Sequence, residues 1–497
     1  MESVEIKKII SSIKKKIKKN INKSRYNNAL DLISMAAIIL YNANLCYVDD
    51  ELENFIDQIA CKIIRTSCNV ESLNSETLLF YDGFGLNSRG LAQIYIKALC
   101  ENNNVIYVTN KKSCNHIPDI ESLIKSNNGK IIWLEGEKSL KCIAEMREII
   151  EFYKPKDFFF YSIPNDVIGT VIMSAYKGIM KIFQVNLTDH AFWLGANNID
   201  YCVEFRDYGA SISNEYRGIS RDKIVKVPFY PIINYKQKFL GFPFVNNSDM
   251  KIIFSGGALY KTFDSKNTYY RIVDHILQTH SDTIFWYAGE GDMTEMNKIT
   301  KRYPQRVYIT SERKDLYQVL ENIYLYLSTY PLCGGLMFQY AASASKVPIT
   351  LRQGDVTDDF LINQNEMGIQ FDDYSSFINE LDHLIDDPEY NMRKGQLVKK
   401  AVITEKKFRE ALTTALVEGK SIYKIKYKHV DSKILRENYL SCFSKAILYK
   451  LFVQKDNKIV IKNYPIYFLY GCLLKILDKL KTIICRRCVG NNKKKWY

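Results

Sequence analysis

The chain has 497 residues, 47% hydrophobic and 25% charged, as in a globular protein rather than a disordered one. Its 69 Lys and Arg against 55 Asp and Glu give a formal net charge of +14, which favours an anionic partner such as nucleotide phosphate, nucleic acid or an acidic membrane surface. A Lys-rich start argues against a secretory signal, no apolar run is long enough to span a bilayer, and twelve cysteines then indicate reduced thiols in a cytoplasm.

Residues 1–75 are predicted to form a helical N-terminal extension. Isoleucines recur on one face of its first helix, with lysines elsewhere: Ile6, Ile9, Ile10, Ile13, Ile17 and Ile21. Taken alone, such a stripe packs most often on the protein's own core.

Residues 76–240 are predicted to form a first Rossmann-like domain. Apolar strands are expected at 77–83, 104–110, 130–136, 157–163, 181–187, 201–207 and 223–230, with helices over 88–102 and 140–153. Continuous apolar strands that alternate with helices indicate a parallel sheet covered on both faces.

A second series of the same kind is predicted over residues 250–410, after a Gly- and Asn-containing linker at 241–249. Strands are expected at 251–257, 283–289, 306–311, 324–330 and 348–353, with helices over 267–280, 293–303, 313–323 and 336–346. The predicted fold class is α/β, with two tandem Rossmann-like domains that face each other across a cleft.

Residues 411–497 are predicted to form a basic helical C-terminal extension. An apolar stripe again runs among lysines: Leu469, Leu473, Ile476, Leu477, Leu480 and Ile484. Two basic amphipathic ends on one chain favour contact with anionic lipid at the inner face of a membrane. Packing on the core or on another subunit is the alternative, and the oligomeric state stays open.

The stretch "FSGGALYK" ends the first strand of the second domain. Ligands of parallel α/β sheets bind beyond the carboxyl ends of the strands. Gly256 and Gly257 would let backbone N–H groups approach an anion, and Lys261 would reach the same oxygens. An ordinary tight turn explains the glycines equally well.

A second glycine pair strengthens the phosphate interpretation. Gly334 and Gly335 precede a helix that is expected to begin near Leu336, so its N-terminal N–H groups would point at a phosphate. Gln339 in the first turns of that helix could bind a ribose hydroxyl. Both loops leave one edge of one sheet and are expected to converge on one diphosphate.

The first domain supplies the candidate for chemistry. Asp189 and His190 follow a predicted strand, so the imidazole could take a proton from an acceptor hydroxyl while the carboxylate orients it. A structural His is the alternative. Gly85 and Arg89 in the loop after the first strand are further candidates to contact the donor, and Arg206 is a candidate to bind substrate or to pair with the neighbouring Asp.

The order of elements resembles that of GT-B glycosyltransferases over residues 77–410. "GALYK" and "YPLCGG" are similar to motifs of the O-GlcNAc transferase branch, and a more distant similarity extends to GT4-like enzymes. The resemblance implies a nucleotide-sugar site in the second domain, an acceptor site in the first, and a His in the region of His190. Gln339 stands where many retaining members carry a glutamate, and Lys346 where a small residue is usual.

The sequence contains no Asp-x-Asp pair, which predicts a metal-independent reaction with no cofactor beyond the nucleoside diphosphate sugar. The leading hypothesis is sugar transfer to a hydroxyl of a glycan, lipid-linked or protein acceptor, in bacterial surface polysaccharide or glycoconjugate synthesis. A nucleotide-sugar 2-epimerase of the same fold is the alternative enzyme. A basic scaffold or nucleic-acid binder is less favoured, because the basic residues are not interleaved with aromatics in a recognisable module.

Overall fold

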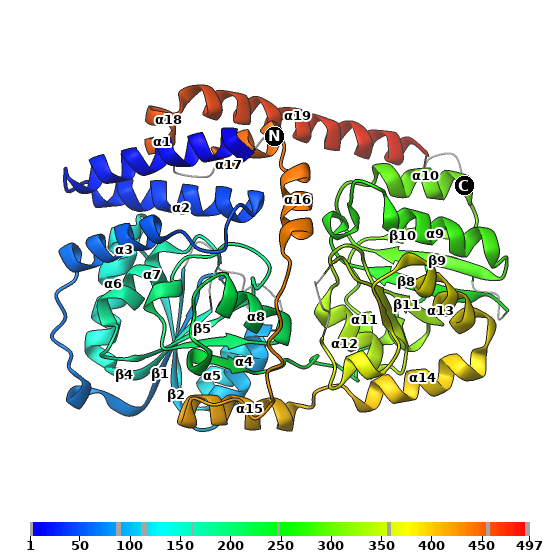
Figure 1. The fold of residues 1–497 in the computed structure, drawn as a ribbon, viewed down its shortest axis with the longest axis horizontal. Coiled ribbons are helices and arrows are strands. Elements are labelled where there is room, and N and C mark those ends of the chain that lie inside the picture. Colours follow the sequence, from blue (N-terminus) through cyan, green and yellow to red (C-terminus); the bar gives the residue numbers. More distant parts are fainter. Residues whose placement is uncertain are drawn as a thin grey trace. The chain divides into compact units, whose positions relative to one another are not determined.

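The computed structural model describes residues 3–85, 91–110, 118–161, 163–245, 249–354, 359–453 and 458–492 (Figure 1). The chain forms two compact units that interleave along the sequence. Unit 1 comprises Met1–Asn87, Asn102–Asp200 and Tyr439–Tyr497, and unit 2 comprises Ser88–Glu101 and Tyr201–Asn438. Because these units are not consecutive stretches of the chain, they do not correspond to the predicted domains one by one. The predicted domain boundaries at 75, 240 and 410 stay predictions.

Seven parallel strands form the first sheet, in the order β3-β2-β1-β4-β5-β6-β7. They are β1 (Asn74–Asp82), β2 (Asn104–Asn110), β3 (Lys130–Leu134), β4 (Pro155–Tyr161), β5 (Lys181–Val185), β6 (Tyr201–Glu204) and β7 (Ile224–Lys226). All seven coincide with predicted strands, and the predicted parallel sheet is confirmed.

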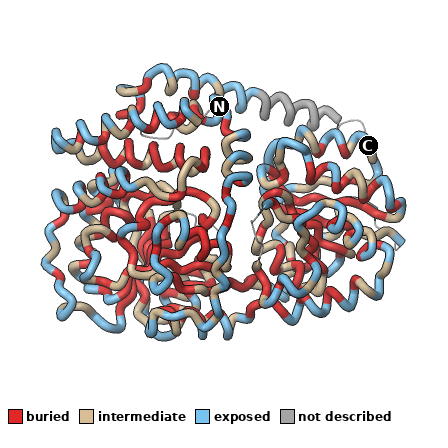
Figure 2. Tube along the Cα trace, in the orientation of Figure 1, coloured by how far each residue is buried: buried red, intermediate tan, exposed pale blue. Residues whose placement is uncertain are grey.

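Aromatic side chains make the core of the first sheet. Phe80, Phe159 and Phe183 are completely buried on adjacent strands, and their rings stack with centroids 6.3 Å and 5.0 Å apart. Phe158 and Phe160 on β4 are equally buried. Since neighbouring residues of a strand point to opposite faces, both faces of the sheet must be covered. Figure 2 shows buried residues running along these strands.

The helices of unit 1 come from both ends of the chain and from the segments between its strands. They are α1 (Ser3–Ile21), α2 (Tyr26–Ala43), α3 (Asp50–Ile63), α5 (Pro118–Ser126), α6 (Ser139–Tyr153), α7 (Val167–Tyr176), α17 (Lys445–Leu451), α18 (Lys458–Asn463) and α19 (Pro465–Asn492). The isoleucine stripe of α1 is buried, with Ile6, Ile13 and Ile17 inaccessible to solvent, and α1 packs on α2. The prediction that this stripe contacts lipid is therefore wrong. The alternative, that the stripe packs on the protein's own core, is correct.

Unit 2 contains the second parallel sheet, in the order β10-β9-β8-β11-β12-β13. Its strands are β8 (Lys251–Gly256), β9 (Thr283–Ala288), β10 (Val307–Thr310), β11 (Leu325–Leu327), β12 (Pro348–Leu351) and β13 (Gln370–Phe371). Its helices are α4 (Leu91–Leu99), α8 (Asp207–Glu215), α9 (Thr268–Thr279), α10 (Thr294–Arg302), α11 (Leu316–Glu321), α12 (Gly335–Ser343), α13 (Tyr374–Asp386), α14 (Pro388–Lys400) and α15 (Glu405–Glu418). The helix α16 (Lys433–Cys442) links the two units in sequence.

The segment predicted to be a linker is partly packed. Phe242 and Phe244 contact the ring of the buried Trp286 on β9, with centroids 6.1 Å away in each case. The Gly, Pro and Asn content indicates turns correctly but does not show that the phenylalanines between them cover the second sheet.

Candidate functional site

The glycine pair after β8 turns the chain at the carboxyl edge of the second sheet. Gly257 has a φ of +130°, which favours glycine, and its N–H donates to the carbonyl of Ala288 at 3.0 Å. Its carbonyl lies so close to Gly289 that a Cβ there would approach it to 1.9 Å. The Gly257 N–H already has a partner, so the glycine pair is required for the turn itself. Anion binding by Gly256 and Gly257 stays a prediction.

Lys261 lies five residues beyond Gly256, in the short helix Leu259–Thr262. Its carbonyl accepts a hydrogen bond from the N–H of Leu332 at 3.3 Å, and a Cβ placed on Gly334 would lie 3.7 Å from the Lys261 ammonium. The two motifs meet because β8 and β11 are neighbours in the sheet. The structure thus brings Lys261 to Gly334.

The N-terminus of α12 faces the same place. Gly334 caps this helix without a side chain, and the first turn of the described helix carries no acidic residue. The first N–H groups of any α-helix lack partners within the helix and carry a partial positive charge. Gly335 has a second reason to be glycine, since a Cβ there would approach the Phe360 ring to 2.6 Å. An ammonium beside a helix N-terminus can hold a diphosphate.

Gln339 lies one turn further along α12 and is 1% exposed. Its amide nitrogen donates to the carbonyls of Phe229 at 2.7 Å and Phe360 at 2.9 Å. Only Oε1, which has no hydrogen-bond partner among the described residues, is left for another group. Gln339 therefore crosslinks two backbone segments around α12, and its contact with a ribose stays a prediction.

Arg206 lies in an aromatic cage within unit 2. Its guanidinium carbon is 4.8 Å from the ring centroid of Tyr208 and 5.1 Å from that of Phe360, the ring that packs on Gly335. Burial raises the pKa of Asp359, and the positive charge of Arg206 opposes this shift. The carboxylate of Asp207 pairs with Lys226 at 2.6 Å, and substrate binding by Arg206 stays a prediction.

In unit 1, Gly85 lies in the loop after β1. Asp82 shapes this loop, since one carboxylate oxygen accepts the N–H groups of Phe84 at 2.9 Å and Gly85 at 3.2 Å. Gly85 has a φ of +63°, in the left-handed region where glycine is favoured. Arg89 lies outside the described residues. The contact of Gly85 and Arg89 with the donor stays a prediction.

Asp189 and His190 follow β5 at the carboxyl edge of the first sheet, also in unit 1. His190 Nδ1 lies 3.3 Å from Asp189 Oδ1, and the side chains are 24% and 1% exposed. A buried carboxylate beside a partly exposed ring can fix the ring so that its other nitrogen faces an acceptor. The geometry permits general-base chemistry, which stays a prediction.

Two residues of the N-terminal helices hold the loop that carries His190. Asn44, in the left-handed conformation at the end of α2, donates from Nδ2 to the His190 carbonyl at 3.0 Å. Glu53 of α3 accepts the Gly195 N–H at 2.8 Å. No sequence motif marks either residue. The one available signal is that Glu53 falls among apolar positions of an amphipathic helix, where a carboxyl group requires a buried partner.

The buried Glu53 predicts a pH-dependent stability. Burial raises its pKa from an ordinary 4.5 to about 8, opposed by the Gly195 N–H. Between these values the folded state binds one proton more than the unfolded state, so this contribution to stability is complete below 4.5 and is lost as pH rises through 8. The free energy of unfolding should fall by at most about 1.4 kcal/mol per pH unit from this group.

Denaturant titrations of the Glu53→Gln variant across that pH range measure this slope. The variant should show a flatter dependence of unfolding free energy on pH, whereas the exposed control Glu71→Gln should follow the unmodified chain. Equal slopes in Glu53→Gln and the unmodified chain would contradict the assignment.

No protein-family model and no curated protein matches the sequence. Among solved structures, a variant of the Thermobaculum terrenum O-GlcNAc transferase matches with a TM-score of 0.50 and 11% identity, over 87% of this chain and 83% of that one. The chain adopts the GT-B fold.

Two further solved structures match with TM-scores below 0.50. The lipopolysaccharide outer core galactosyltransferase WaaB matches with a TM-score of 0.49 and 15% identity, over 69% of this chain and 99% of that one. A UDP-GlcNAc 2-epimerase from Neisseria meningitidis bound to UDP-GlcNAc matches with a TM-score of 0.46 and 12% identity, over 69% of this chain and 100% of that one. At these identities the likeness concerns the fold, and the activity must be argued from the site.

In the described part of the chain, no group of three or more His, Cys, Asp and Glu side chains is placed to hold a metal ion. The absence of a metal requirement nevertheless stays a prediction. Among the described helices, none is long and apolar enough to cross a membrane.

Proposed function

We propose that the chain is a metal-independent GT-B glycosyltransferase that moves a sugar from a nucleoside diphosphate sugar to a hydroxyl acceptor. The observation that carries this proposal is the position of the Lys261 ammonium beside Gly334, at the N-terminus of α12, which has no side-chain cap. No further cofactor is required in this proposal.

The proposed role of Lys261 is to stabilise the leaving group. When the bond between sugar and diphosphate breaks, negative charge develops on the diphosphate. A fixed ammonium and the first N–H groups of α12 stabilise such charge without reorganising during the reaction. Lys261 and the α12 N-terminus thereby take the part that a metal ion has in other transferases.

The proposed role of His190 is to remove the proton from the acceptor hydroxyl. Asp189 is completely buried and touches the ring through Nδ1, which leaves Nε2 as the nitrogen that accepts the proton. Asn44 and Glu53 act through this loop and are positioning residues.

The proposed acceptor is a glycan, a lipid-linked sugar or a protein, in bacterial surface polysaccharide or glycoconjugate synthesis. The proposed setting is the cytoplasm, at the inner face of the membrane. The basic amphipathic C-terminal segment supports this setting.

Incubation of the purified chain with a panel of UDP- and GDP-sugars, with and without EDTA, tests the proposal. We expect nucleoside diphosphate to be released from one donor, with sugar passing to water or to an added acceptor, and no loss of rate with EDTA. Release of nucleoside diphosphate without such transfer, or a change of the sugar at C2, would favour the epimerase. No reaction and no binding with any donor would favour a scaffold.

A further inference from the structure

The net positive charge of the chain is concentrated at its two ends. Residues 1–25 contain nine Lys and Arg against two Glu, and residues 445–497 contain thirteen Lys and Arg against two Asp. The net charges of these segments, +7 and +11, together exceed the +14 of the whole chain. The body between them is therefore net negative, and the basic character is localised.

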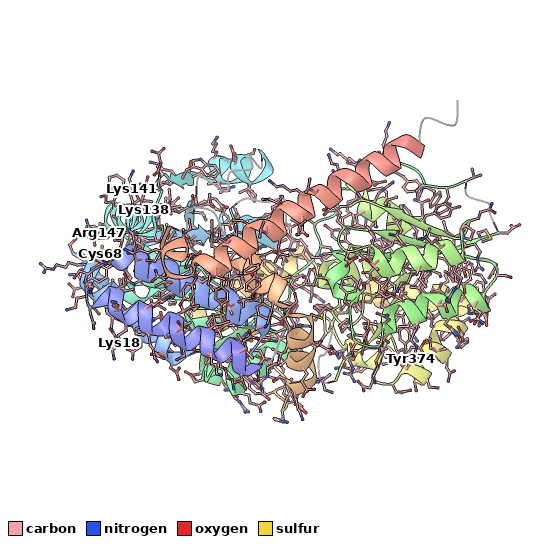
Figure 3. The ribbon with its side chains drawn as sticks, turned by 90° about the horizontal axis from the view of Figure 1, so that it is seen from above. Lys18, Cys68, Lys138, Lys141, Arg147 and Tyr374 are labelled. Atoms are coloured by element: carbon pink, nitrogen blue, oxygen red, sulfur yellow. The ribbon has the colours of Figure 1, made fainter. Side chains whose placement is uncertain are left out.

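The two basic ends meet in unit 1. Lys16 on α1 donates to the carbonyl of Asn463 at 2.8 Å, and its ammonium lies 3.5 Å from the ring centroid of Tyr464. Lys445 on α17 pairs with Glu5 at 3.3 Å. In Figure 3, α1, with Lys18 labelled, and α19 both lie on the side turned toward the viewer. Segments more than 400 residues apart thus bring the two basic ends of the chain side by side.

The helix α19 adds an exposed apolar stripe to this face. Leu469, Leu473 and Ile476 are 61%, 57% and 55% exposed. Other exposed large apolar residues on the helix are Ile466, Tyr470, Leu477 and Leu480. The spacing of three and four residues places them along one side of the helix.

A different side of α19 fixes the helix to the protein. Gly471 is buried where the helix meets α17, and a Cβ there would approach the Tyr449 carbonyl to 2.2 Å. Lys475 donates to the carbonyl of Val453, and Asp478 pairs with Lys450 of α17. The helix is therefore anchored by these contacts while Leu469, Leu473, Leu477 and Leu480 remain exposed.

We propose that this face of α19, with the lysines around it, docks on an anionic lipid bilayer. A helix with an exposed apolar stripe and flanking lysines lies in the plane of a membrane interface, with apolar side chains among the acyl chains and ammonium groups at the phosphates. A second copy of the chain fits the face less well, because two clusters of positive charge would be brought together. This surface goes beyond sugar transfer and does not depend on it.

Sedimentation of the full chain with phosphatidylcholine vesicles, with or without phosphatidylglycerol, tests the proposal. Binding is expected only to the phosphatidylglycerol-containing vesicles, and it should weaken as salt rises. Replacing Leu469 and Leu473 by Asp should lower partitioning about tenfold or more, and Lys479→Glu about fivefold or more. The matched controls Val417→Asp and Lys301→Glu, which alter exposed residues of unit 2, should leave it unchanged.

Unchanged partitioning of both α19 variants would overturn the proposal, as would equal binding to vesicles without phosphatidylglycerol. A concentration-dependent dimer that the Leu469 and Leu473 substitutions abolish, without vesicle binding, would also overturn it by assigning the face to a second copy. Binding of UDP and GDP is measured on the same samples. Loss or retention of nucleotide binding reports on the donor site alone. The proposals of sugar transfer and of membrane docking can therefore be refuted independently.

Discussion

Replacing His190 by Ala is expected to lower the rate of sugar transfer by about 10²–10⁴-fold with little change in donor affinity. The imidazole is 24% exposed and touches the buried Asp189, as a positioned base requires. Its removal takes away the proton acceptor but none of the groups around Lys261. Single-turnover rates and a separate donor titration distinguish these two effects.

The matched control for this variant is His383→Ala, which removes a half-exposed imidazole from α13. It should transfer sugar at the unmodified rate. Asp189→Asn should retain the fold of the loop but orient the ring less well, and an intermediate loss of rate is expected. Near-normal turnover in His190→Ala would assign the residue a structural role.

Replacing Lys261 by Ala should weaken binding of the nucleoside diphosphate about tenfold or more, because a charge-assisted hydrogen bond contributes roughly 1.5–3 kcal/mol. Transfer should slow as well, since the same ammonium is proposed to stabilise the leaving group. Calorimetric titration with UDP and GDP measures the affinity, and circular dichroism checks that the fold is retained.

Lys266→Ala provides the control for charge, since this exposed lysine follows the same loop. It should bind the diphosphate with nearly unmodified affinity. Lys261→Arg keeps the charge but changes its geometry, so it should bind better than Lys261→Ala. An affinity unchanged in Lys261→Ala would mean that the glycine pair merely turns the chain.

The sequence predicts the sheets well because their strands are apolar runs bounded by turn residues. The run at 157–163 coincides with β4, and its aromatic residues leave little alternative to a buried strand. The strand β13 is not predicted, because two residues are too short to show a pattern. The helices α5, α7, α8, α13 and α14 are not among the predicted elements either.

The two ends of the chain show what periodicity leaves undetermined. Both terminal helices carry an apolar stripe among lysines, yet Ile13 on α1 is completely buried and Leu469 on α19 is 61% exposed. Periodicity identifies which face of a helix is apolar. Whether another element covers that face depends on tertiary packing, which the local pattern does not contain.

Some features of the candidate site can likewise be predicted from the sequence, and others depend on tertiary packing. Lys261 lies close to Gly334 because their glycine motifs follow neighbouring strands of one parallel sheet. Ligands bind at this edge of such sheets, so the proximity can be predicted from the sequence. The engagement of the Gln339 amide by two carbonyls depends on backbone segments more than 20 residues away along the chain. The same holds for Asn44, which reaches the His190 loop from α2.

A structure of the chain with UDP or GDP bound tests the central claim most directly. We expect a diphosphate oxygen within hydrogen-bond distance of Lys261 Nζ and of the first N–H groups of α12. A diphosphate bound away from both Lys261 and Gly334 would contradict it.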